Sequence, residues 1–220
     1  MDGAFSSESD LEIKTALISV TDKTGMVDFA ARLREHGVSI ISTGGTLKAL
    51  RDAGVEARSI EEVTGFPEML DGRVKTLQAT IHAGILADKS DPEHMETIRR
   101  FNISPIDMVV CNFYNFTEAA ARRDSSLDAL IEKIDIGGPT MVNAAAKNHG
   151  SVLVVTSPES YGRIADEMDR NGGRVSPETR WRGFIDAVTT VGNYRGAIAS
   201  VFREIDAGRE QQRADRRKVR

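Results

Sequence analysis

The fold is decided by the stretch Ala16-Leu17-Ile18-Ser19-Val20-Thr21-Asp22-Lys23-Thr24-Gly25, in which a short apolar run ends in a polar turn closed by glycine. Such a run is typical of a strand buried on both faces. From 26 to 36, apolar side chains recur at helical spacing, and Gly37 follows as a helix stop. The stretch therefore predicts one strand–turn–helix unit.

The same unit repeats in the next part of the chain. A second strand is predicted at 38–41, the turn Ser42-Thr43-Gly44-Gly45-Thr46 follows it, and a helix is predicted over 47–53. A weak strand at 55–60 is expected near an edge of the sheet. Repeated units of this kind predict an α/β fold with a parallel sheet flanked by helices on both faces. Ligands of such sheets bind at the carboxyl ends of the strands, where both polar turns are expected to lie.

The remaining chain completes the sheet and adds helices. Further strands are predicted at 106–111 and 152–155. Helices are predicted at 92–101, 127–134, 140–149, 158–170 and 177–205, the last of them as a C-terminal helical segment. The segment 61–86 breaks the alternation, and long irregular segments inside compact domains are usually functional.

The expected domain organisation is simple. Residues 1–13 are acidic and serine-rich and are expected to be a disordered leader. Residues 14–207 form one domain that includes the C-terminal helices. Residues 208–220 are expected to be a disordered basic tail, solvated rather than a nucleic-acid arm.

Composition excludes several function classes. The net charge of −4 gives no reason to expect a nucleic-acid partner. The single cysteine, Cys111, excludes an internal disulfide framework and fits a reducing cytosol, so a cytoplasmic location is expected. Cys111 lies in an apolar run and is interpreted as a buried small residue rather than a nucleophile. No signal peptide and no membrane span are predicted, and the histidines have no metal-ligand spacing.

Two turns are candidates for holding a phosphate. In Thr43-Gly44-Gly45-Thr46, glycines let backbone N–H groups converge and hydroxyls add donors at a helix start. Thr21-Asp22-Lys23 occupies the equivalent place after the first strand, where Lys23 can reach the same phosphate. Capping of the following helix by Thr21 or Asp22 is the alternative interpretation.

The irregular segment and the end of the fourth strand add candidate groups. Arg73-Val74-Lys75-Thr76 places two cations on alternate residues of a glycine-flanked loop; a solvated pair of charges is the alternative. A lysine near another cation in a partly closed site is a candidate for proton transfer. Tyr114 follows a strand, so its phenol faces either the pocket or the core. His82 and His149 are interpreted as structural.

The stretch from Ile134 to His149 reads as an acid, a glycine turn and then a helix. Asp135 precedes Ile136-Gly137-Gly138-Pro139, where glycine permits close backbone approach and proline suits a first helical turn. The helix start predicted there is suited to an oxyanion or a phosphate. Lys147 lies near the far end of this helix. An acidic cap and a solvated lysine form the alternative interpretation.

Taken together, residues 16–202 resemble the inosine monophosphate (IMP) cyclohydrolase domain of the bifunctional purine biosynthesis protein. The resemblance is carried by long motifs in order: 19–25, 42–46, 64–77, 111–114 and 134–149. It implies the methylglyoxal-synthase-like α/β fold. It also implies closure of 5-formamidoimidazole-4-carboxamide ribotide (FAICAR) to IMP with loss of water, without metal or cofactor.

The resemblance further implies a set of site residues. The catalytic set is Lys75, Tyr114, Asp135 and Lys147. The nucleotide is expected on Thr21, Asp22, Lys23, Thr43, Gly44, Gly45, Thr46, Arg73, Val74, Thr76, Cys111, Asn112, Ile136, Gly137 and Gly138. In this scheme Asp135 orients the carboxamide, Lys147 acts as general acid or base, and backbone N–H groups near Gly137 hold the developing oxyanion.

Departures from the family pattern keep alternatives open. Gln78, Asn115 and Asn143 stand where the family usually has histidine, proline and arginine, which leaves ring closure on a modified nucleotide as an alternative. A nucleotide-binding regulatory module of the same fold, or a methylglyoxal synthase, is a further alternative. A transformylase domain follows in the bifunctional protein, so the chain is either free-standing, with a separate transformylase, or a piece of a longer protein. A homodimer is expected.

Overall fold

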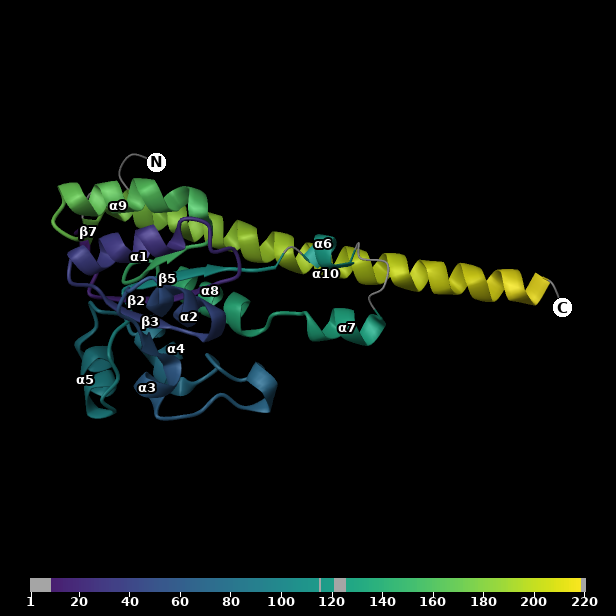
Figure 1. Ribbon diagram of the computed structural model, residues 1–220, viewed down its shortest axis with the longest axis horizontal. Helices are drawn as coiled ribbons and strands as arrows, with labels where there is room; N and C mark the ends of the chain where they lie inside the picture. Colours follow the sequence, from purple (N-terminus) through teal and green to yellow (C-terminus); the bar gives the residue numbers. More distant parts are fainter. Residues whose placement is uncertain (1–8, 115, 121–125, 219–220) are drawn as a thin grey trace.

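The computed structural model describes residues 9–114, 116–120 and 126–218 of the chain (Figure 1). Its centre is a five-stranded sheet with the order β4-β3-β2-β5-β6, and every neighbouring pair is parallel. The strands are β2 (Thr15–Val20), β3 (Ser39–Ser42), β4 (Arg58–Ser59), β5 (Met108–Asn112) and β6 (Leu153–Val155). The parallel sheet is confirmed, and the weak strand lies at its edge as predicted.

Helices cover both faces of this sheet. One face carries α1 (Met26–Glu35), α2 (Gly44–Asp52) and α9 (Tyr161–Arg170), and the other carries α3 (Ile60–Thr64), α4 (Ala79–Leu86), α8 (Gly137–Lys147) and the first half of α10 (Pro177–Lys218). The alternation of β2 explains this arrangement, because successive side chains of a strand point to opposite faces. Ala16, Ile18 and Val20 join the first core, whereas Leu17 joins the second.

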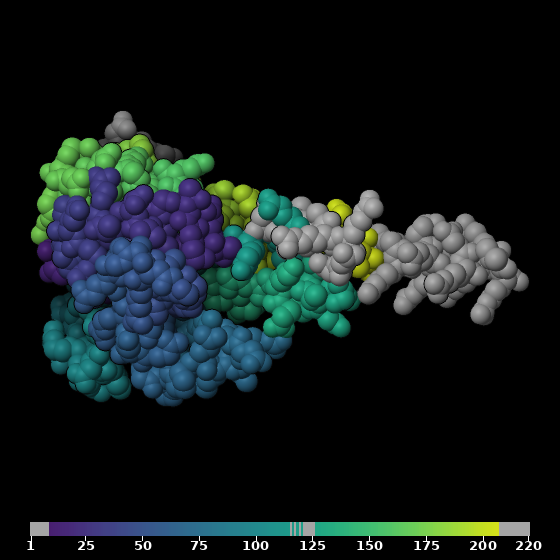
Figure 2. All heavy atoms as spheres, in the orientation of Figure 1, coloured from purple at the N-terminus to yellow at the C-terminus, as the bar shows by residue number. Residues whose placement is uncertain are grey.

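The other elements lie around this core. They are β1 (Leu11–Glu12), α5 (Pro92–Arg100), α6 (Phe116–Ala120), α7 (Leu127–Glu132), β7 (Arg174–Val175) and the 3₁₀ turns η1 (Leu70–Gly72) and η2 (Pro158–Ser160). The outer half of α10 extends beyond the body of the molecule, with α6 and α7 beside it (Figure 1). Figure 2 shows α7 projecting from the body of the molecule. Phe116, Leu130 and Tyr194 are buried in a third core at this junction.

Two expected boundaries need correction. Residues 1–8 of the expected leader lie outside the described residues, but Leu11 pairs with Val175 in an antiparallel bridge and Ile13 is buried in the core. The leader's last residues therefore belong to the domain. The segment 208–218, expected to be disordered, continues α10 as helix. Its glutamate, glutamine, alanine, arginine and lysine residues all favour helix, which explains the difference.

Across the described part of the chain, no helix is both long enough and apolar enough to cross a membrane.

Candidate active site

A cleft of about 710 Å³ opens where β2, β3 and β5 end. Its size lies within the range of roughly 300–1,000 Å³ that is usual for small-molecule sites. Most residues of the expected site line it: Thr21, Lys23, Thr43, Gly44, Gly45, Thr46, Arg73, Lys75, Thr76, Cys111, Asn112, Tyr114, Asp135, Ile136, Gly137 and Gly138. The parallel sheet brings the turns after β2, β3 and β5 to one edge, and the loop between α3 and α4 and the start of α8 complete the cleft.

Asn112, the last residue of β5, holds the turn that follows β2. Its side-chain oxygen accepts hydrogen bonds from the backbone N–H groups of Thr21 and Asp22 at 2.8 and 2.9 Å, and its amide donates to the Asp22 carbonyl at 3.0 Å. Asp22 points along the turn and accepts from the Thr24 N–H at 2.9 Å. Hydrogen bonds from Thr24 lower the pKa of Asp22. Asp22 therefore shapes the turn that presents Lys23, and it does not line the cleft.

The turn that begins α2 forms the next wall. Thr46 accepts from the Val20 N–H at 3.1 Å and donates to the Val20 carbonyl at 2.9 Å, while the Ser19 and Thr43 hydroxyls are 2.7 Å apart. A Cβ added at Gly44 would lie 3.5 Å from the Lys75 Nζ, and one added at Gly45 would lie 4.0 Å from the Lys23 Nζ. Two ammonium groups thus flank a helix N-terminus, an arrangement suited to an anion.

Asp135 stands at the start of α8, opposite that turn. Its Oδ1 accepts a hydrogen bond from the Gly138 N–H at 3.0 Å, and its own N–H donates to the Tyr194 hydroxyl at 2.7 Å. A Cβ added at Gly138 would lie 2.4 Å from the Asp135 Oδ2, and one added at Gly137 would lie 2.8 Å from the Thr76 Oγ1. The two glycines therefore let the helix start lie directly against the carboxylate.

Tyr194 is a supporting residue that the sequence analysis missed. It comes from α10, it is 6% exposed, and its ring lies 5.2 Å from that of Phe113. Burial raises the pKa of Tyr194. Its position in an ordinary helical pattern, far along the chain from Asp135, gave no signal of this contact.

The Tyr194→Phe variant is expected to lose about 1–3 kcal/mol of unfolding free energy, because it leaves the part-buried Asp135 N–H without its acceptor. Urea unfolding measures this loss. Tyr161→Phe is the matched control: Tyr161 is also buried and stacks on Phe29, but its hydroxyl makes no hydrogen bond with the described residues. Equal losses in the two variants would contradict a specific role for the Asp135 contact.

Two more cleft residues differ in exposure. Tyr114 is 61% exposed, so its phenol is free to meet a ligand, and the core alternative does not hold for it. Cys111 is buried in the cleft floor, and burial raises the pKa of its thiol. A thiol that resists ionisation is a poor nucleophile, in agreement with its interpretation as a packing residue.

Lys147 is the one member of the expected catalytic set that lies elsewhere. It is exposed at the end of α8, roughly 15 Å along the helix from Gly137 at 1.5 Å per residue. There it lines a separate groove of about 590 Å³ with Lys89, His149 and Arg180. A sequence motif places residues in order but does not fix which end of a helix faces a site. Within one subunit, the structure does not bring Lys147 to the cleft.

The remaining expectations are placed as follows. Val74 is half-buried in the loop between α3 and α4 and does not line the cleft. Gln78 donates to the Lys75 carbonyl at 3.2 Å and Asn143 is exposed on α8, so neither lines the cleft. Asn115 lies outside the described residues. His149 lies 5.2 Å from Phe184 between ring centroids.

Acidic residues around the cleft were also missed. Asp71 and Glu132 line it, and Glu68 pairs with Lys75 next to it. Glu132 accepts two hydrogen bonds from Arg73, and this contact lowers the pKa of Glu132. Among the described residues, no group of histidine, cysteine, aspartate and glutamate is arranged to hold a metal ion.

A parallel α/β sheet with a cleft at the carboxyl ends of its strands is typical of ligand-binding α/β proteins. Comparison with known protein families identifies the family within this class. The family model "MGS-like domain" matches residues 25–140, more than half of the chain, so the chain belongs to this family. A second model, "AICARFT/IMPCHase bienzyme", matches residues 145–220. The resemblance seen in the sequence motifs is thereby confirmed.

Individual relatives narrow the class. The chain is 50% identical over 192 residues to the bifunctional purine biosynthesis protein PurH of Caldicellulosiruptor bescii. This match covers 87% of the chain but only 37% of the length of PurH. A solved structure titled "Crystal structure of ForH" matches with a TM-score of 0.77 and 32% identity, over 86% of this chain and 99% of that one.

Proposed function

We propose that the chain is an IMP cyclohydrolase that closes FAICAR to IMP with loss of water in the cytoplasmic pathway of purine biosynthesis. The observation that carries the proposal is the placement of Asp135, Lys75 and Tyr114 around one cleft whose far wall is built to hold an anion. The homology to PurH supports the same activity. The reaction needs no metal or cofactor.

The nucleotide is placed by its phosphate. We assign the phosphate to the turn at the start of α2, where backbone N–H groups and the Lys23 ammonium converge. The base then points toward Asp135 and the start of α8. In the proposed step the carboxamide nitrogen attacks the formyl carbon, a C–N bond forms, and one carboxamide proton passes to the formyl oxygen. The C–O bond of the resulting hydroxyl then breaks, and water leaves with the proton of the formamide nitrogen as a C=N bond forms to the former formyl carbon.

Residues on each side of the cleft have a role in this step. The cleft holds two groups of one molecule together, which supplies much of the acceleration of an intramolecular reaction. The Asp135 carboxylate, fixed by the Gly138 N–H, accepts the carboxamide N–H and orients its nitrogen. Lys75 and Tyr114 stand where they can donate protons to the departing oxygen. The Gly137 N–H at the start of α8 is assigned to the oxyanion that develops on the formyl oxygen, because the Gly138 N–H is held by Asp135 and Pro139 has no N–H.

The experiment follows ultraviolet absorbance while the purified protein is mixed with FAICAR, because ring closure builds a purine chromophore. Rapid conversion is expected, with kcat about 100-fold lower in Lys75→Met and in Asp135→Asn. Near-normal turnover in both variants would contradict the residue assignment. Tight binding of FAICAR without conversion would instead assign the cleft to a nucleotide-binding regulatory module.

Lys147 is tested in the same assay. Its role as general acid or base, implied by the resemblance, requires that a second copy of the chain bring it to the cleft, because within one subunit it lies at the far end of α8. Loss of turnover in Lys147→Ala together with a dimer in sedimentation would support that role. Normal turnover would assign Lys147 to the separate groove.

A further inference from the structure

A short hairpin between α3 and α4 carries two of the cations of the cleft. Met69 and Val74 form an antiparallel bridge, with N–H to carbonyl distances of 3.2 Å and 3.3 Å. The tip is strained, because Leu70 and Asp71 both have φ of 53°, and Gly72 follows with φ of 88°. Non-glycine residues with positive φ cost free energy and persist only where their surroundings hold them. Contacts outside the tip must therefore fix this hairpin.

The ion pair between Glu68 and Lys75 is such a contact. These residues are the next pair outward from the bridge between Met69 and Val74, and the Lys75 Nζ lies 2.9 Å from the Glu68 Oε2. Opposite charges on facing residues of an antiparallel pair stabilise it. Both side chains are about one-third exposed, 32% for Lys75 and 39% for Glu68. The pair closes the base of the hairpin and fixes the direction of the Lys75 side chain.

Two glycines enclose this ion pair. A Cβ added at Gly72 would lie 2.5 Å from the Glu68 Oε1 and 3.2 Å from the Lys75 Nζ. A Cβ added at Gly44 would lie 3.5 Å from the same Nζ. The ammonium therefore sits between the hairpin tip and the turn at the start of α2, with the Glu68 carboxylate behind it.

The other charged groups around Lys75 have different positions. Arg73 is engaged by Glu132 across the cleft, and Lys23 lies on the Gly45 side of the α2 turn. Asp71 and Asp135 line the cleft, but neither forms an ion pair with Lys75. Among the described residues, Glu68 is the carboxylate that pairs with Lys75.

We propose that Glu68 is a positioning residue that holds the Lys75 ammonium in the cleft at the turn that begins α2. The inference rests on the proposed function, since it assigns Glu68 a role through Lys75. Glu68 itself does not line the cleft and is not expected to touch the substrate. Its contribution is the position of Lys75, which depends on a hairpin that the ion pair closes.

A double-mutant cycle tests this proposal. Glu68→Gln is expected to lower kcat about 10-fold and to change KM much less, because the lysine loses its position while the other binding groups stay in place. In a Lys75→Met background the same substitution is expected to have no further effect on kcat, because two residues that act through one contact are not additive. Glu96→Gln is the control, since it removes an exposed carboxylate paired with Arg99 on α5, away from the cleft.

A second readout does not depend on turnover. Acetylation of Lys75 by a water-soluble active ester, followed by peptide mass spectrometry, is expected to be several-fold faster in Glu68→Gln than in the unmodified protein or in Glu96→Gln. Unchanged labelling would overturn the proposal, and so would equal losses of kcat with and without Lys75. Full turnover of Lys75→Met would contradict the catalytic assignment of Lys75, whereas the labelling result would still decide whether Glu68 holds it.

Discussion

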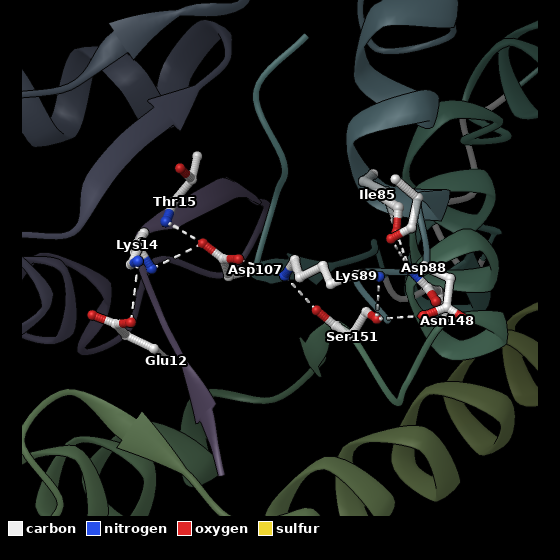
Figure 3. A network of polar contacts seen from close by, with 10 residues as sticks. Glu12, Lys14, Thr15, Ile85, Asp88, Lys89, Asp107, Asn148 and Ser151 are labelled. Atoms are coloured by element: carbon white, nitrogen blue, oxygen red, sulfur yellow. Dashed lines mark hydrogen bonds and ion pairs between the residues drawn. The ribbon is translucent and has the colours of Figure 1, made fainter. Parts of the chain in front are cut away.

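The Asp107→Asn variant is expected to lose about 3–5 kcal/mol of unfolding free energy, as is typical when one partner of a buried ion pair is removed. Asp107 is 6% exposed and lies at the amino end of β5 (Figure 3). One carboxylate oxygen accepts the N–H groups of Lys14 and Thr15 at 2.8 and 2.7 Å, and the other pairs with the Lys89 ammonium. Lys89 also donates to the Ser151 carbonyl.

The cost arises at Lys89. Burial lowers the pKa of this lysine, and the Asp107 charge opposes that shift. Without the carboxylate, the ammonium stays largely buried near the cations Lys14 and Arg180, which lower its pKa further. The folded-state pKa then lies further below the ordinary value of 10.5, and the unfolded chain binds more protons between the two values. The variant should therefore regain stability relative to the unmodified protein as pH rises toward 10.5, and it should stay fully destabilised below the folded-state pKa.

Urea unfolding at neutral and alkaline pH measures both effects. Glu96→Gln, which breaks an exposed ion pair, is the control and should cost at most about 1 kcal/mol. Adding Lys89→Met to Asp107→Asn should recover part of the loss, because the uncompensated charge is then removed as well. A loss for Asp107→Asn no larger than that of the control would show that this network contributes little to stability.

The network and the cleft lie at opposite ends of the same strands, and this explains what the sequence could predict. Apolar runs at 16–20 and 38–41, each followed by a polar turn and a helix, were enough to predict a parallel sheet, because repeated strand–helix units fold in that way. Parallel strands also place every turn that follows them at one edge. The convergence of Lys23, Gly44 and Asn112 was therefore predictable from local sequence alone.

Long-range contacts were not predictable in the same way. The bond from Asp135 to Tyr194 joins a loop to a helix 59 residues later, and nothing in the pattern of α10 distinguishes Tyr194 from its other apolar-face residues. Lys147 is a different case. The motif that runs from Asp135 to Lys147 suggested that both residues belong to one site. Helix α8 lies between them, so Asp135 lines the cleft whereas Lys147 lines the separate groove.

The ion-pair partners of the cleft cations were also not predictable from the sequence. Arg73 and Lys75 were recognised as cations in a glycine-flanked loop, but their partners Glu132 and Glu68 were not identified. Glu68 lies within the motif 64–77 together with Lys75, so the signal was an acid seven residues before the lysine, across a tight turn. To recognise the pair, one would need the register of the hairpin. That register depends on positive φ at Leu70 and Asp71, which secondary-structure propensities do not predict.

The Gly138→Ala variant is expected to lower kcat about 100-fold, as much as Asp135→Asn, because a misplacement of an orienting group by about 1 Å costs on the order of 100-fold. A methyl group at Gly138 would lie 2.4 Å from the Asp135 Oδ2 and 3.0 Å from two ring atoms of Phe113. Real Cβ atoms essentially never approach that closely, so something must move. The Phe113 ring is packed against Tyr194, which leaves the Asp135 carboxylate as the group with room to move.

Moving that carboxylate breaks its hydrogen bond with the Gly138 N–H and takes it away from the carboxamide it is proposed to orient. The helix itself should tolerate the change, because alanine favours a helix over glycine by about 1 kcal/mol. Circular dichroism is therefore expected to show a folded protein in which turnover of FAICAR has fallen. Gly162→Ala on α9 is the matched control, because its methyl group would meet no atom within 4 Å. Normal turnover in a folded Gly138→Ala protein would mean that the position of the Asp135 carboxylate does not limit the reaction.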